Sequence, residues 1–155
     1  MATDYWPDQD GRIFDCLTVS AYAESTSITA NYAVMMGTST SGILKVTVPS
    51  SSNLGEGFGI ALKTPVAVGD YIPVMLLGIC KTIVAGFGAA ASVQKVMVGS
   101  LVINSGVTGI IGVGDANSGV FLTPLWKGSS CILGKALQSG VSASDEVLIF
   151  VGKCF

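Results

Sequence analysis

The feature of this sequence that most constrains its fold is an internal repeat between residues 59–81 and residues 134–155. Each stretch begins with a Gly-Xaa-Ala-Leu segment, passes through a polar turn that ends in an aspartate, and continues as an alternating apolar segment. Alternation with period two is typical of a β-strand that buries one face. The repeat therefore predicts two related halves. The matching pairs are Gly59 and Gly134, Ala61 and Ala136, Leu62 and Leu137, Val66 and Val141, and Asp70 and Asp145.

Short apolar segments between glycine, proline, serine and asparagine continue the β pattern outside the repeat. Residues 43–48 are expected to form a strand, and residues 71–77 another that lies at an edge or carries a bulge, because Pro73 has no backbone donor. No segment carries the long apolar stripe of an amphipathic helix. The sequence predicts an all-β fold, a small barrel or sandwich with two related halves in residues 16–155, preceded by an extended N-terminal arm of residues 1–15.

The composition predicts a surface with few charges. Charged residues make up 12% of the 155 positions and hydrophobic residues 50%, whereas roughly 25% of an ordinary globular domain is charged. So few charges leave broad apolar patches, which normally mark an interface, and we therefore expect subunits to bury part of the surface. The balance is uneven, because residues 1–24 carry a net charge of −4 and residues 25–155 a net charge of +2. An acidic N-terminal segment would bind a basic surface.

The same composition argues against membrane and nucleic-acid partners. The longest charge-free run, residues 96–114, is interrupted by glycine, serine, asparagine and threonine and does not predict a spanning helix. The lysines are scattered singly, without the interleaved aromatic residues of a nucleic-acid site. The first residues lack the basic and apolar regions of a signal peptide, so synthesis in the cytoplasm is expected.

No group of residues predicts catalysis, a metal or a cofactor. Histidine is absent, and the four cysteines lack the paired spacing of a zinc site. Small, reduced cysteines are the favoured interpretation, with a pairing of Cys80 and Cys154 left open. Residues 86–91 resemble a dinucleotide loop, but residues 100–114 contain no acid to follow it.

Asp70 and Asp145 occupy matching positions of the repeat and suggest a pair of carboxylates. Each follows a small residue, Gly69 or Ser144, at the entrance to a strand, where an aspartate commonly accepts hydrogen bonds from turn amides. We therefore interpret Gly69, Asp70 and Asp145 as structural turn residues.

With these residues in view, residues 59–74 and 132–149 resemble the small capsid decoration, or cement, proteins of tailed bacteriophages. The resemblance rests on the Gly-Xaa-Ala-Leu segment, the turn at Gly69 and Asp70, and the valine-rich strand, while Ser144 departs from the glycine of the family's turn. It implies a structural virion protein without enzymatic activity or cofactor. Such proteins bind the outside of the icosahedral capsid as homotrimers and stabilise the shell by bridging subunits of the major capsid protein.

The resemblance also implies that an N-terminal arm contacts the capsid. Residues 1–15 would be that arm, with Tyr5, Trp6, Pro7 and Arg12 as its capsid-binding residues.

Two other function classes stay open. One is a β-sandwich binding module for carbohydrate or a host surface, with Trp6 or Trp126 as a stacking platform. The other is a small enzyme, which would need Ser92 and Lys95 together in a ligand-sized pocket.

Overall fold

The computed structural model describes residues 16–38, 42–49, 57–84, 96–104, 110–113, 132–142 and 144–152, and these residues form strands, turns and loops without a helix. The strands are β1 (Leu17–Ala23), β2 (Ala33–Met36), β3 (Lys45–Thr47), β4 (Gly59–Ala61), β5 (Tyr71–Ile83), β6 (Leu101–Asn104), β7 (Ile110–Val113), β8 (Ile132–Ala136) and β9 (Glu146–Val151). The prediction of an all-β fold built on a small barrel is confirmed.

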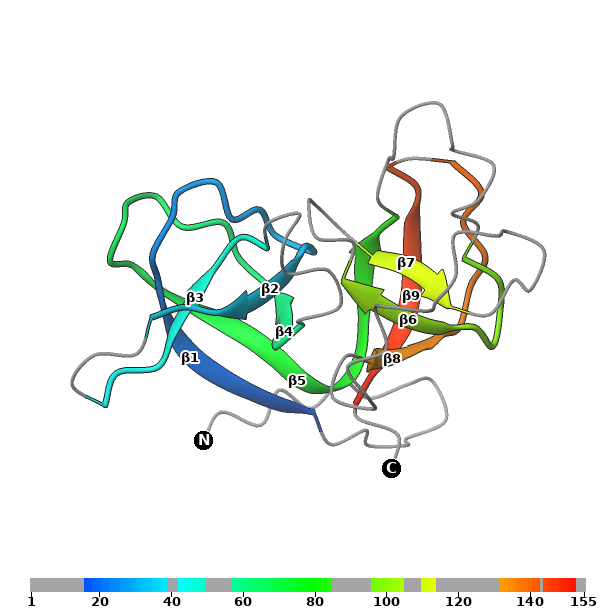
Figure 1. Cartoon of the computed structure of the whole chain (residues 1–155), viewed down its shortest axis with the longest axis horizontal. Coiled ribbons are helices and arrows are strands. Elements are labelled where there is room, and N and C mark those ends of the chain that lie inside the picture. The colour runs from blue at the N-terminus through cyan, green and yellow to red at the C-terminus, as the bar shows by residue number, and fades with distance from the viewer. Residues whose placement is uncertain are drawn as a thin grey trace, which may run out of the picture.

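Strands β1 to β5 form a closed barrel (Figure 1). Their order is β1-β3-β2-β4-β5, and β5 pairs with β1 again to close the ring. Every neighbouring pair is antiparallel except β1 and β3, which run parallel with Tyr22 opposite Lys45. Small and branched apolar side chains fill the interior: Ala21, Ala23, Ile28, Val34, Val46, Ala61, Ile72 and Val74.

Strand β5 belongs to both halves of the molecule. Its first part pairs with β1 and β4, and its second part, from Gly78 to Ile83, pairs with β9. The φ of Gly78 is +131°, and a Cβ there would lie 2.9 Å from the Cβ of Cys16, so only glycine fits where the strand passes between the halves. The expected edge position is wrong, because β5 is paired on both sides. The expected irregularity is present in the ladder with β1, as a register shift between Leu17 and Thr18.

The second half repeats the order of the first. Beyond β5 the sheet continues as β9, β8, β6 and β7, so that β8 takes the place of β4 and β9 the place of the first part of β5. The structure explains why the repeat has glycine at positions 59 and 134. A Cβ on Gly59 would lie 2.5 Å from the carbonyl oxygen of Met75, and a Cβ on Gly134 would collide with that of Phe150. In each half the neighbouring backbone occupies the space that a side chain would need.

The two halves pack directly against each other. Ala33, Ile60 and Met75 of the barrel are buried in one cluster with core residues of the second half. Thr82, a fully buried residue on the second part of β5, donates its hydroxyl to the carbonyl oxygen of Asn31 in the first half, at 2.9 Å. The shared core and the shared strand make the described residues one body.

Candidate functional site

An aspartate closes the turn before the last strand of each half. Oδ2 of Asp70 accepts hydrogen bonds from the amides of Val66 at 2.7 Å and Ala67 at 2.9 Å. Oδ2 of Asp145 accepts the two matching bonds, both at 2.9 Å. The amides of Ala67 and Val66 lower the pKa of Asp70, because they stabilise the charged carboxylate. In both halves the aspartate acts by ordering the turn.

The residue before each aspartate adopts the left-handed conformation. The φ of Gly69 is +103° and that of Ser144 is +71°. Their amides donate at 2.9 Å to the carbonyl oxygens of Ala23, the last residue of β1, and of Val84, which directly follows β5. Serine thus takes the place of glycine in the second turn, although this conformation disfavours side chains.

The structure does not bring the two carboxylates together. The loop between β4 and β5 lies at one end of the long axis of the molecule, and the loop between β8 and β9 lies toward the other (Figure 1). A shared acid–base site of Asp70 and Asp145 therefore has no support in the geometry.

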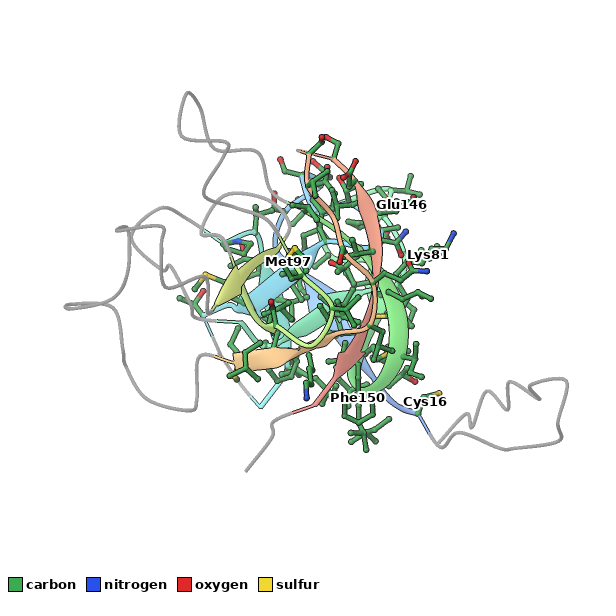
Figure 2. All side chains as sticks on the ribbon, turned by 90° about the vertical axis from the view of Figure 1, so that its right-hand side faces the viewer. Cys16, Lys81, Met97, Glu146 and Phe150 are labelled. Carbon is green, nitrogen blue, oxygen red and sulfur yellow. The ribbon has the colours of Figure 1, made fainter. Side chains whose placement is uncertain are left out.

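Exposed apolar side chains gather at both ends. The first end face consists of Val66, Val68 and Tyr71, which are 87%, 60% and 60% exposed, beside the exposed Lys63. The second end face consists of Met97, Val98, Leu137 and Val141, which are 47%, 66%, 41% and 58% exposed. Met97 lies near the middle of the face that Figure 2 presents.

Matching hydrogen bonds relate the two end faces position by position. In the first half the amide of Ala30 donates to Oγ1 of Thr64, and in the second half the amide of Val98 donates to Oγ of Ser139. The backbone hydrogen bonds around these contacts also match. The bond from Asn31 N to Ala61 O corresponds to that from Gly99 N to Ala136 O, and the bond from Tyr32 N to Thr29 O corresponds to that from Ser100 N to Met97 O. Met97 and Val98 therefore occupy the positions that Thr29 and Ala30 occupy in the first half.

A third apolar surface, the junction surface of Leu17, Leu77 and Phe150, lies where the halves meet. These side chains are 40%, 41% and 38% exposed, and Leu17 pairs with Leu77 across β1 and β5. A Cβ on Gly152 would lie 3.0 Å from both Leu77 Cδ1 and Phe150 Cε1, so these side chains are close neighbours. Cys16 and Phe150 mark the same lower edge in Figure 2. The described chain therefore begins and ends beside the junction surface.

Several residues singled out in the sequence lie outside the described residues. They are Tyr5, Trp6, Pro7 and Arg12 of the arm, Trp126 of the binding-module hypothesis, and Ser92 and Lys95 of the enzyme hypothesis. Cys80 is a free thiol in the core, and burial raises its pKa to about 12. In the part of the chain that the structure describes, no three His, Cys, Asp or Glu side chains gather to hold a metal ion, and no helix has the length and apolarity to span a membrane.

The exposed residues of the second end face and the junction surface were not predicted from the sequence. Met97 and Val98 match Thr29 and Ala30 at an offset of 68 positions, whereas the repeat that is visible in the sequence has an offset of 75. An alignment of the two halves of the sequence that allows a gap would have matched Met97 and Val98 with Thr29 and Ala30. Comparison with protein-family models and with curated proteins finds no match to this chain.

Proposed function

We propose that this protein is a non-enzymatic structural protein of a bacteriophage virion that decorates the outside of an icosahedral capsid. It binds the assembled shell as a homo-oligomer, with a homotrimer expected, and bridges subunits of the major capsid protein. The observation that carries the proposal is the junction surface, where exposed apolar side chains lie beside the point at which the N-terminal arm joins the barrel.

The junction surface and the arm together suit one docking side. Residues 1–15 contain four aspartates and one arginine, so the arm brings a net charge of −3 to the edge of an uncharged apolar surface. Acidic groups steer association with a basic partner, and burial of apolar area holds the complex. The expected partner is a basic groove with an apolar floor on the major capsid protein.

The arrangement of the two halves supports bridging. One continuous strand and one shared core join the halves, so the junction surface between them is carried by a single body that can lie across a boundary between capsid subunits. A body that binds across a subunit boundary of the assembled shell, and not to free subunits, stabilises the assembled state by mass action. This stabilisation is roughly 2.7 kcal/mol per site when the free concentration is 100 times Kd.

Co-sedimentation with empty shells of the major capsid protein from the same genome tests the proposal. The full chain is expected to sediment with the shells, and a double variant of the junction surface, L77S/F150S, is expected to remain in the supernatant. The matched control is V66S/V68S on the first end face, which removes two exposed apolar side chains far from the junction surface and should sediment normally.

Two outcomes decide against capsid decoration. The full chain would fail to sediment with shells at micromolar concentration, or the control variant would lose binding as completely as the junction variant. Specific retention on a carbohydrate array after the first outcome would favour the binding-module hypothesis.

A further inference from the structure

We propose that copies of this chain associate with one another through the second end face, formed by Met97, Val98, Leu137 and Val141. This inference rests on the subunit association within the proposed function, and it names the surface that carries that association. It does not depend on the junction surface or on contact with a capsid.

The first half shows that the fold does not require apolar side chains at two of these positions. Thr29 and Ala30 stand where Met97 and Val98 stand, with the same backbone hydrogen bonds around them. Because the first half forms the matching loop with a polar and a small residue at these positions, Met97 and Val98 are not needed to build the loop. Their exposure, 47% and 66%, also excludes a role as core residues. A requirement outside the single chain accounts for them better than folding does.

The lack of charge on the second end face favours a second copy as its partner. Residues 96–100 and 136–142, the two described segments that form the face, contain no charged side chain. In a symmetric contact each group near the axis meets its own copy, so that any charge there would face a like charge. An uncharged apolar face has no such conflict.

The charged groups of the second half lie beside this face. Lys81 and Glu146 pair at 3.4 Å on the flank, away from Met97 (Figure 2). Lys135 borders the face, where its Cε lies 3.9 Å from the position of a Cβ on Gly99. The first end face differs, because residues 61–67, which match residues 136–142 of the second half, include the exposed Lys63. Of the two ends, the second is therefore better suited to meet its own copy.

The size of the face limits what the contact must include. Four side chains exposed at these fractions present on the order of 300 Å² of apolar surface, the size of a functional patch on a typical monomer. A stable interface takes about 800 Å² from each partner, so the contact extends over the polar border of the face. The exposed residues of that border are Gln138, Ser139 and Ser142.

Sedimentation equilibrium of the full chain, measured without capsids, tests the inference. In the double variant M97T/V98A both side chains become those of the first half, and this change is expected to weaken self-association at least tenfold. The matched control V66S/V68S alters the first end face and should associate as the wild type does.

A folding measurement and a second variant guard against a loss of association that is caused by unfolding. Circular dichroism must show that M97T/V98A is folded. If it is not, V98K replaces it, because a lysine at the contact would face its own copy and should dissociate the oligomer. A wild-type chain that stays monomeric at the highest concentration, or an M97T/V98A variant that associates as the wild type does, would overturn the inference. Equal losses in M97T/V98A and V66S/V68S would do the same. Capsid co-sedimentation is scored separately, so a chain that binds shells without self-association refutes this inference alone.

Discussion

Replacing Ser144 by glycine should stabilise the protein. Ser144 holds a φ of +71° in the turn of the second half, the conformation that Gly69 holds in the first. A non-glycine residue in this conformation costs about 1–2 kcal/mol, and relief of that cost stabilises the folded state of S144G. Glycine also gives the unfolded chain more freedom, which offsets about 0.5–1 kcal/mol of the gain. The net expectation is a rise of about 0.5–1 kcal/mol in the free energy of unfolding.

Urea denaturation followed by circular dichroism measures this difference, and thermal melting should show a rise of roughly 1–3 °C for a chain of this size. The matched control is S142G in the same turn. Ser142 is not among the described residues with positive φ, so S142G should lose about 0.5–1 kcal/mol. An S144G variant no more stable than the wild type, or an S142G variant that gains equally, would refute the reasoning.

Three further expectations follow from single side chains. T82V removes the hydroxyl that bonds Asn31 O across the two halves, and urea denaturation should show a loss of about 1–2 kcal/mol. The pKa of Asp70 is lowered from 3.8 on folding, so its contribution to stability is present above pH 3.8 and disappears as the pH falls through the lower folded pKa. Thermal melting from pH 6 to pH 2 should therefore show a weaker acid dependence in D70N. Cys80, with a pKa of about 12 in the core, should react with a thiol reagent at pH 8 only after unfolding, measured in a variant whose other three cysteines are serine.

The repeat could be predicted from the sequence because its causes are local. Three local features recur at a fixed spacing in the sequence. They are a glycine that leaves room for the backbone of the next strand, an aspartate that accepts hydrogen bonds from turn amides, and alternating apolar residues. Gly59, Asp70 and the start of β5 were found in this way, together with their partners in the second half.

The shared strand could not be predicted, because its evidence is not local. In the sequence, Gly78 indicates the end of a strand, since glycine usually weakens a strand. The strand nevertheless continues to Ile83, because β9 supplies a partner from a distant part of the sequence. The exposed surfaces were missed for a similar reason. Val96 and Val98 are both apolar, but the first is fully buried and the second is 66% exposed, a difference that only the packed loops determine.

Strand β5 also sets an order for folding during synthesis. Every strand of the closed barrel has been synthesised once β5 is complete, whereas β9, the antiparallel partner of its second part, begins only at Glu146. Domains generally fold as units from the N-terminus while the chain is being made. We therefore expect the barrel to close first and to hold the second part of β5 as a template on which the later strands assemble. A chain interrupted before β9 would keep its barrel but present that strand to other nascent chains.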